Sequence, residues 1–244
     1  MILKIQNRND FVSSFMDPIS KISENCVIKI DKANLSSLAA SPDGTLILYS
    51  KYKHKGDVEE DASLNIACVN KFLKICSYID KPDLKLQVDH DKVLYEDDDV
   101  QFNYFLVEDG VISTPAVSVD KLKKVKYDTS FTIPNSVFND LNKLSLYAND
   151  SDKVYFWTED GNVVAELNDR KRPNINNVRI KVCENYKGDG ITTPIPIRYE
   201  NIRIISASQR DEINMFVNTE LSVVLFQHAN ENTNAAYFVS GMIG

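Results

Sequence analysis

Long apolar runs are missing from this chain of 244 residues, and so are the short motifs that mark many enzymes. No stretch of about 18 apolar residues occurs, and the start MILKIQNRND soon turns polar, so the sequence predicts neither a transmembrane helix nor a signal peptide. GxGxxG, GxxxxGK[ST] and GxSxG patterns are also absent. We therefore expect a soluble, cytoplasmic protein without a phosphate cradle or a nucleophile elbow.

Potential metal ligands are few and scattered. The 4 cysteines form no CxxC pair, and the 3 histidines, His54, His90 and His228, lie far apart in the sequence. The acidic runs 89–91 and 96–99 fall between expected strands, where Asp favours turns, and neither matches a calcium loop. The sequence predicts no metal, no cofactor and no catalytic residue, and hence a protein that is not an enzyme.

The balance of charge is acidic, with a formal net charge of −7 and a pI near 5.1. Phosphate binding needs clustered Lys and Arg, so a protein that coats nucleic acid with its whole surface is disfavoured. A locally basic face on an acidic body stays open.

The stretch 62–106 shows one structural plan clearly. Phe72, Ile75, Cys76 and Ile79 recur at helical spacing, and Lys71 and Lys74 fall on the opposite arc. Three alternating or aromatic runs follow, LKLQV, KVLYE and VQFNYFL, separated by Asp-rich breaks. This pattern predicts a strand, an amphipathic helix and three more strands, with the helix covering the sheet.

The same order recurs about four times, beginning near Ile2, Ala62, Lys126 and Asn201. In the first repeat we expect Pro18 to end or kink a helix that carries Asp10 and Asp17 opposite its apolar stripe. In the third, the turn at Asp160 and Gly161 between the expected strands KVYFWTE and NVVAELN carries the Asp-Gly hairpin signal. In the fourth, IRYENIRII is expected as a strand, and Ser206 and Gln209 match a capping box for a short helix around SASQRDE after it. We predict an α+β fold of two similar domains, 1–108 and 126–244, joined by a connector at 109–125.

The polar helix faces are where function is expected. Basic residues occur there in three of the four repeats: Lys71, Lys74, Lys143 and Arg210. For any one of these lysines, ordinary solvated surface and a functional role are equally open, but their recurrence at equivalent places in two units favours a shared role.

With these units, the helix CVNKFLKICSYI, the mid-chain connector and the final pattern LSVVLFQHANENTNAAYFVSGMI, the sequence resembles the DNA polymerase sliding clamps. It is more similar to the bacteriophage and proliferating-cell-nuclear-antigen type than to the longer bacterial type. The resemblance implies a processivity factor for DNA replication: a homotrimeric ring with helices inside and sheets outside, which encircles duplex DNA irrespective of sequence. DNA polymerase and a clamp loader are the implied partners, and no membrane is involved.

The resemblance also implies two further sites. Edge strands of neighbouring subunits would pair, which places the seam between 100–106 and 178–183. The seam residues are Val100, Phe102, Tyr104, Val178, Ile180 and Val182. Partner peptides would dock in an apolar cleft beside the connector, for which the candidates are Val111, Ile112, Pro115, Val117, Met242 and Ile243.

Two other functions compete. A viral or phage structural protein of repeated sheet units would share the strands and the oligomeric edges but would need no basic helix face. A single-stranded-DNA-binding protein would need exposed aromatics on a sheet, for which Tyr95, Phe102, Tyr104 and Phe105 are candidates, although the acids at 96–99 argue against it. The abundance of Lys, Asn, Ile and Asp indicates an AT-rich genome and favours a bacteriophage, whose protein would act in the host cytoplasm.

Overall fold

A computed structural model describes residues 1–172, 174–207 and 211–241. The chain divides into two compact units. The first unit contains Met1–Val119 and Ala229–Ala235, and the second contains Asp120–His228 and the residues from Ala236 onward. Within the described ranges, none of the helices has the length and hydrophobicity that crossing a bilayer requires.

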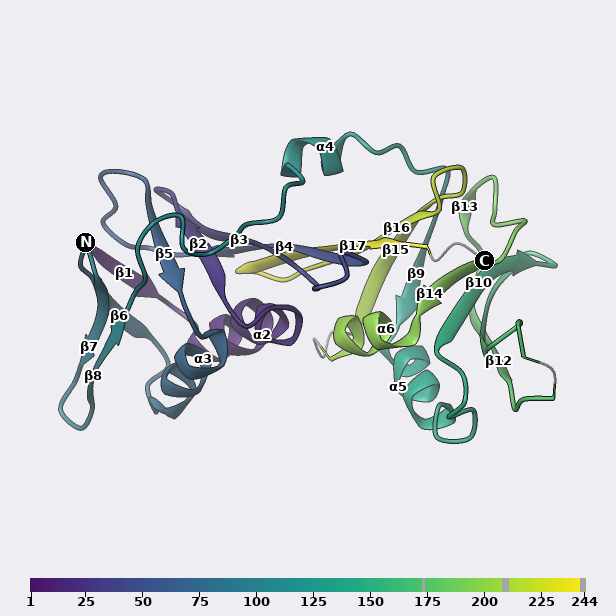
Figure 1. Ribbon diagram of the computed structural model, residues 1–244, viewed down its shortest axis with the longest axis horizontal. Helices are drawn as coiled ribbons and strands as arrows, with labels where there is room; N and C mark the ends of the chain where they lie inside the picture. The colour runs from purple at the N-terminus through teal and green to yellow at the C-terminus, as the bar shows by residue number, and fades with distance from the viewer. Residues whose placement is uncertain (173, 208–210, 242–244) are drawn as a thin grey trace. The chain divides into compact units, whose positions relative to one another are not determined.

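The first unit has two antiparallel sheets and two helical segments (Figure 1). One sheet has the strand order β1 (Ile2–Ile5), β6 (Leu84–Val88), β7 (Lys92–Glu96) and β8 (Gln101–Phe105). The other has the order β4 (Leu46–Lys53), β3 (Asn34–Ala40), β2 (Cys26–Ile30) and β5 (Ala62–Ile66). The helical segments are a continuous run of α1 (Arg8–Asp10), η1 (Phe11–Met16) and α2 (Asp17–Ile22), and α3 (Val69–Tyr78), which packs against it.

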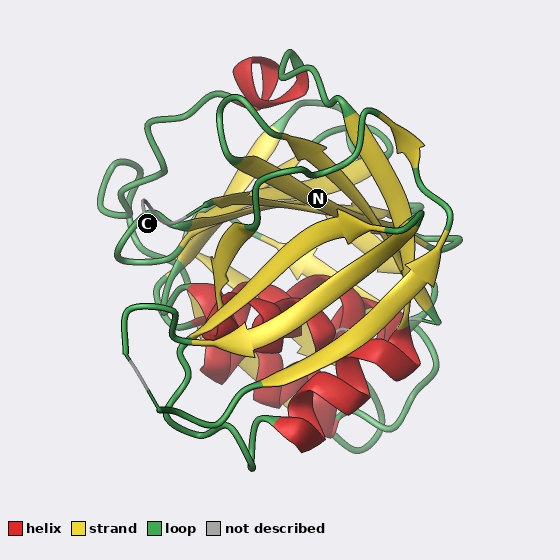
Figure 2. Cartoon of the chain, turned by 90° about the vertical axis from the view of Figure 1, so that its right-hand side faces the viewer, coloured by secondary structure: helices red, strands yellow, loops and turns green. Residues whose placement is uncertain are grey.

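The second unit repeats this arrangement. One sheet has the order β12 (Val178–Glu184), β11 (Asn162–Asn168), β10 (Lys153–Glu159) and β14 (Ile195–Arg198). The other has the order β13 (Lys187–Gly188), β9 (Thr129–Pro134), β15 (Glu212–Asn218), β16 (Val223–Ala229) and β17 (Thr233–Ser240). The helices α5 (Asn135–Leu144) and α6 (Tyr199–Ser206) pack against each other, and Figure 2 shows helices lying against the strands. A short helix, α4 (Val119–Lys123), begins at the last residue of the first unit's main segment and continues into the second unit.

The predicted repeat is confirmed. A strand, a helical segment and three strands occur in succession four times, starting at β1, β5, β9 and β14. The expected Asp-Gly hairpin is also present, because Asp160 and Gly161 both have positive φ, 49° and 77°, between β10 and β11. The sequence thus determines the order of the elements in both units.

The position of the fourth helix is wrong in the prediction. The helix begins at Tyr199, so the run Ile202–Ile205 that was expected as a strand is helical. Ile202 and Ile205 are buried at i, i+3 spacing, as on an amphipathic helix. A short β-branched run suits either structure locally, and its burial within the unit favours the helix.

The first helix passes through Pro18 and continues to Ile22, so the proline does not end it. The turn before Pro18 is π-helical, with the Asp17 N–H donating to the Val12 carbonyl. Proline lacks an N–H and needs room for its ring, and it stands in the first turn of α2, where no donor is required. The wider π-helical turn therefore accommodates the proline ring, and the helix continues beyond it.

Asp10 is also placed differently from the prediction. It is only 9% exposed, and its carboxylate accepts hydrogen bonds from Asn230 Nδ2 at 2.6 Å and Thr233 Oγ1 at 2.9 Å. A buried carboxylate is stable when such donors replace its water. Asp10 thus fastens the segment Ala229–Ala235 to the first helix and adds no charge to that helix's outer face.

Candidate functional site

Helix α3 presents the clearest basic surface. Phe72 and Cys76 are fully buried, while Lys71 and Lys74 are exposed on the other side, as predicted. Neither lysine forms an ion pair with a described residue. These two ammonium groups are therefore available for an anionic partner.

The orientation of α3 is set from both ends. At its start the Tyr104 hydroxyl accepts from the Cys68 N–H at 2.9 Å and donates to the Cys68 carbonyl at 3.1 Å, and the Tyr104 ring meets Phe72 edge-on at 5.1 Å. At its end the Arg8 guanidinium donates to the Ser77 carbonyl at 3.0 Å and to the Lys81 carbonyl at 3.0 Å. A cation at a helix C-terminus satisfies carbonyls that lack helical partners. Arg8 thus holds α3 in place.

Lys143 lies on the exposed face of α5, as predicted, but an acid stands beside it. Its ammonium is 4.0 Å from Asp140 Oδ1, and both side chains are more than half exposed. Such a pair is worth about 0–1 kcal/mol and leaves the lysine free to turn toward another anion. The local charge of α5 is nevertheless balanced.

Arg210 lies outside the described residues. The basic residue that the structure does show on the fourth helix is Arg203, which the sequence prediction missed because it placed the helix later. Arg203 is exposed and donates to Glu200 Oε2 at 2.9 Å. The i, i+3 acid–base pair at Glu200 and Arg203 was the signal that could have located this helix.

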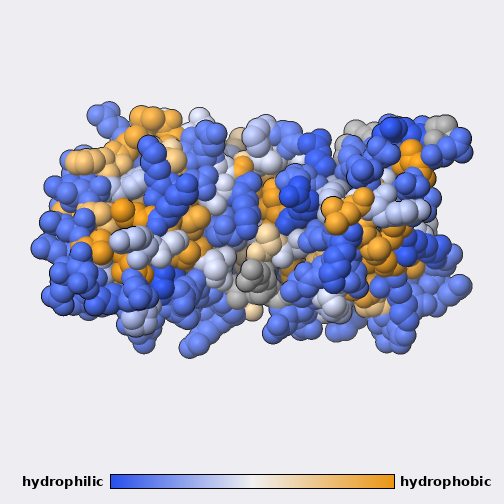
Figure 3. Space-filling model, turned by 90° about the horizontal axis from the view of Figure 1, so that it is seen from below, coloured by the Kyte–Doolittle hydropathy of each residue, from blue (hydrophilic) through white to orange (hydrophobic). Residues whose placement is uncertain are grey.

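On the first helix, Lys21 is paired with Asp17 at 2.5 Å, and both side chains are partly exposed. Of the four helical segments in the repeated units, three therefore carry an exposed cation next to an acid, whereas α3 carries two lysines and no acid. Hydrophilic residues predominate on the surface drawn in Figure 3, with hydrophobic residues in smaller groups among them.

Strand β8 is a sheet edge, as the seam prediction requires. Two hydrogen bonds at the ends of the pair show which residues bond to β7: the Leu106 N–H donates to the Asp91 carbonyl, and the Asp97 N–H donates to the Val100 carbonyl. Phe102 and Tyr104, which lie between them at every second position, therefore also bond to β7. By the alternation of an antiparallel ladder, the backbone groups of Gln101, Asn103 and Phe105 point away from β7. These groups form the free edge.

The side chains predicted for this half of the seam do not project from that edge. Phe102 is 7% exposed, Tyr104 is occupied by the start of α3, and Val100 is half-buried. Phe105, by contrast, is 67% exposed. Any pairing here would use the backbone of β8 and the exposed Phe105.

Strand β12 is the corresponding edge of a sheet in the second unit. Val182 is buried, and Val178 and Ile180 are half-buried. Between them Arg179 and Lys181 are exposed, and the Arg179 guanidinium lies over the Trp157 ring at 5.0 Å and forms an ion pair with Glu159. The edge thus presents a free backbone with cationic side chains on one face.

The aromatic surface that the alternative function, a single-stranded-DNA-binding protein, would require is not formed by three of its four candidate residues. Tyr95 is 4% exposed and its ring stacks on Phe102 at 5.7 Å. Tyr104 packs on α3, which leaves Phe105 as the one exposed ring of the set. Stacking of several bases needs adjacent exposed rings.

The connector candidates are partly accessible. Val111 is 64% exposed, and Ile112, Pro115 and Val117 are half-buried. Met242 and Ile243 lie outside the described residues.

Catalytic chemistry finds little support in the described part of the chain, where no group of three His, Cys, Asp or Glu side chains could hold a metal ion. Burial raises the pKa of the Cys26 and Cys76 thiols to about 12, so neither is a thiolate near neutral pH. The His54 ring is held on both sides: Nδ1 accepts from the Gly56 N–H, so Nε2 donates to the Asp31 carbonyl at 2.8 Å. These groups have structural roles.

No family model matches the chain, and no curated protein matches it in sequence. Solved structures do match it in fold, over nearly the whole length of both chains. The proliferating cell nuclear antigen of Entamoeba histolytica aligns with a TM-score of 0.81 at 11% identity, covering 99% of this chain and 98% of that one. The A. fulgidus protein solved with the C-terminal region of FEN-1 aligns with a TM-score of 0.80 at 12% identity, covering 99% of both chains.

The PCNA2–PCNA3 complex of Sulfolobus tokodaii aligns with a TM-score of 0.78 at 11% identity, again covering 99% of both chains. These neighbours share the two-unit architecture over the full chain, although residue identity is low. The chain therefore has the sliding-clamp fold of the proliferating-cell-nuclear-antigen type.

Proposed function

We propose that this protein is a sliding clamp: a ring of three copies that encircles duplex DNA and tethers a DNA polymerase for processive synthesis. The observation that carries the proposal is the fold, which matches solved clamps over 99% of the chain. The fold alone does not fix the function, so support from the chain's own residues is needed.

That support comes first from α3. Lys71 and Lys74 are exposed, unpaired within the described residues and held on a helix that is anchored at both ends. Attraction between lysines and phosphates is long-ranged and independent of base sequence, which suits a protein that slides. Lys143 and Arg203 would add weaker contributions, because each has an acid beside it.

The second support is the pair of free strand edges. A head-to-tail ring needs two different, complementary edges on each copy, and β8 and β12 supply one each. The alternative function, a viral or phage structural protein, would also use such edges, but it gives no reason for the two lysines of α3 that are unpaired among the described residues. The basic face of α3 is the feature that favours the clamp.

The remaining parts of the proposal concern partners. One structural neighbour was solved with the C-terminal region of FEN-1, so peptide binding occurs on this fold. For this chain we place the docking of polymerase and clamp-loader peptides at the connector, with Val111 as its most exposed apolar residue. The chain acts as a non-catalytic scaffold in the cytoplasm, that of the host if a bacteriophage encodes it.

Assembly is tested first. Light scattering at micromolar concentration should give three times the chain's 27.7 kDa, or about 83 kDa. A strict monomer across the accessible concentrations would contradict the ring.

DNA encirclement is tested by threading. The protein is incubated with linear duplex whose ends are then blocked by bulky protein caps, and the complex is challenged with salt. A ring stays on capped DNA and leaves after a restriction cut between the caps, whereas a simple surface binder leaves at the same rate before and after the cut. Equal rates would overturn the proposal.

The site is tested with Lys71→Ala/Lys74→Ala. We expect faster loss from DNA of every sequence, with the slope of log affinity against log salt falling by up to about 2 for each subunit. The matched control is Lys32→Ala/Lys55→Ala, which removes the same charge from exposed lysines outside the helices. If both double variants behave alike, α3 is not the DNA-binding face.

A further inference from the structure

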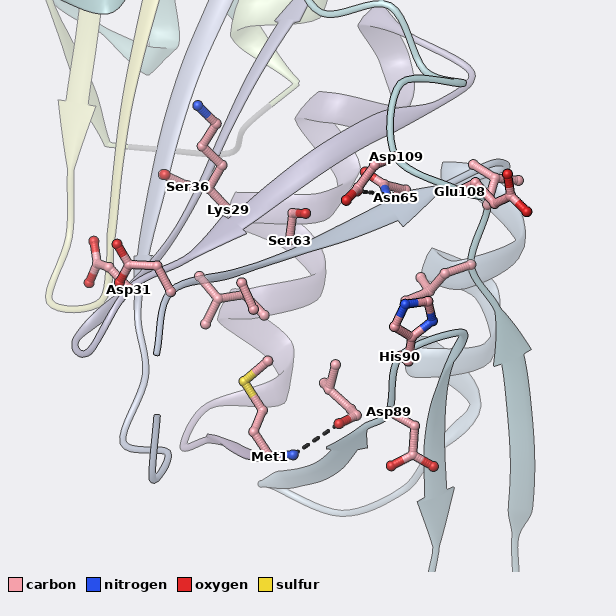
Figure 4. Close-up of a pocket in the computed structure, with 16 residues that line it drawn as sticks. Met1, Lys29, Asp31, Ser36, Ser63, Asn65, Asp89, His90, Glu108 and Asp109 are labelled. Atoms are coloured by element: carbon pink, nitrogen blue, oxygen red, sulfur yellow. Dashed lines mark hydrogen bonds between the residues drawn. The ribbon is translucent and has the colours of Figure 1, made fainter. Parts of the chain in front are cut away.

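An open cavity lies in the first unit, away from the helix faces. It has a volume of about 1020 Å³ and is lined by β5, by the turn between β6 and β7, and by the segment after β8 (Figure 4). In Figure 4, Ser63 and Asn65 on β5 form one wall, and Asp89 and His90 on the turn form another. Nothing in the clamp function proposed above uses this cavity.

One wall is an unpaired strand edge. Among the residues that the structure describes, strand β5 ends its sheet and pairs only with β2. The Asn65 carbonyl accepts from the Val107 N–H at 3.2 Å, so Asn65 directs its backbone groups away from β2. Because this direction alternates along a strand, Ser63 also directs its N–H and its carbonyl outward. Apart from the hydrogen bond to Val107, no described residue bonds to this edge of β5.

The lining is strongly acidic. Lys29 and the terminal amine are its only fixed cations among the described residues, and the amine already donates to the Val88 carbonyl at 2.9 Å. None of the lining carboxylates forms an ion pair with a described residue. These carboxylates belong to Asp31, Asp61, Asp89, Glu108 and Asp109.

We propose that this cavity binds a basic, extended peptide segment of a partner protein, which adds as a strand to the free edge of β5. A free edge selects an extended backbone through main-chain hydrogen bonds. The carboxylates select lysine or arginine side chains by charge complementarity, and the cavity has room for several residues. The proposal does not depend on the clamp function, because the edge of β5 and the acidic side chains lie outside the helix faces and outside the seam strand β8.

Binding is measured by fluorescence anisotropy with a labelled hexapeptide of alternating lysine and valine, blocked at both ends. We expect saturable binding by this probe and none by the matching peptide of alternating glutamate and valine. Asp61→Lys/Glu108→Lys should weaken binding about tenfold or more. Asp150→Lys/Glu220→Lys, which reverses two exposed acids of the second unit, should leave it nearly unchanged.

Strand addition is separated from simple charge attraction with backbone-methylated probes. One probe carries N-methyl groups on its lysines and the other on its valines, so that one of the two loses every N–H that would face β5. One methylated probe should fail to bind and the other should bind like the parent. Two methylated probes that both bind like the parent would overturn strand addition.

The location is tested in the protein itself. Ser63→Pro removes an outward N–H while leaving the hydrogen bonds between β2 and β5 intact, so the variant should fold and lose the probe. Amide exchange at Ser63 and Asn65 should slow when the probe is bound to the unaltered chain. The proposal would be refuted if the probe protected amides elsewhere in the chain, or if Ser63→Pro still bound the probe. It would also be refuted if a second copy of the chain occupied the cavity, which would be seen as a dimer that Asp61→Lys/Glu108→Lys abolishes.

Discussion

Asn103→Pro tests the seam at a single backbone atom. Asn103 stands in the middle of β8, and the ladder places its N–H on the free side of the strand. Proline is tolerated where a strand's N–H faces solvent, so the isolated chain should fold normally. In the assembled ring the same N–H would bond to the neighbouring subunit, and proline would remove that bond.

The expected cost follows from these contacts. Loss of one hydrogen bond between strands costs about 1 kcal/mol, and the proline ring pushes against the opposing strand and weakens an adjacent bond as well. A total of about 2–3 kcal/mol for each seam corresponds to a weakening of roughly 30- to 150-fold in its dissociation constant. The ring should therefore dissociate at a protein concentration that is higher than for the unaltered chain by a factor of this order.

Sedimentation velocity over a dilution series measures this change, and circular dichroism checks that the monomer is folded. Asn103→Ala is the matched control, because it removes the same side chain but keeps the N–H, and it should assemble like the unaltered protein. A folded Asn103→Pro protein that dissociates at the same concentration as Asn103→Ala would show that β8 is not in the seam.

Three further predictions concern stability and reactivity. Asp10→Ala should lower the free energy of unfolding by about 2–4 kcal/mol in urea titrations, because the buried Thr233 hydroxyl and the Asn230 amide lose a charged acceptor, and Asp10→Asn should cost less. The hydrogen bond from the Tyr95 hydroxyl, followed by those from the Asp99 and Val100 N–H groups, lowers the pKa of Asp97. The stability that Asp97 contributes is therefore present above the usual pKa of a free Asp and is lost as the pH falls through the lowered value. Tyr95→Phe should raise the pKa of Asp97 in an NMR titration, and an unchanged midpoint would contradict the hydrogen bond. With their pKa values near 12, Cys26 and Cys76 should resist a thiol reagent in the native protein at mildly alkaline pH and react once it is unfolded, whereas rapid native labelling of either would contradict its burial.

The order of elements could be predicted from the sequence because it depends on local periodicity. The 3.6-residue spacing of Phe72, Cys76 and their neighbours indicated α3, and alternating runs indicated the strands on either side of Asp160 and Gly161. The exposed positions of Lys71, Lys74 and Lys143 followed from the same spacing. Where a pattern was locally ambiguous, as at Ile202–Ile205, the prediction failed.

Other features depend on residues that are distant in the sequence, and only the tertiary structure decided them. Asp10 is buried because Asn230 and Thr233, more than 200 positions later, donate to it. The Tyr104 ring of β8 turns inward because it packs against Phe72 of α3. The free edge of β5 exists because one partner strand lies beside it and none on the other side among the described residues. A sequence specifies which residues can face a core or an edge, but long-range pairing determines which edges stay open, and those open edges carry both the proposed seam and the proposed peptide site.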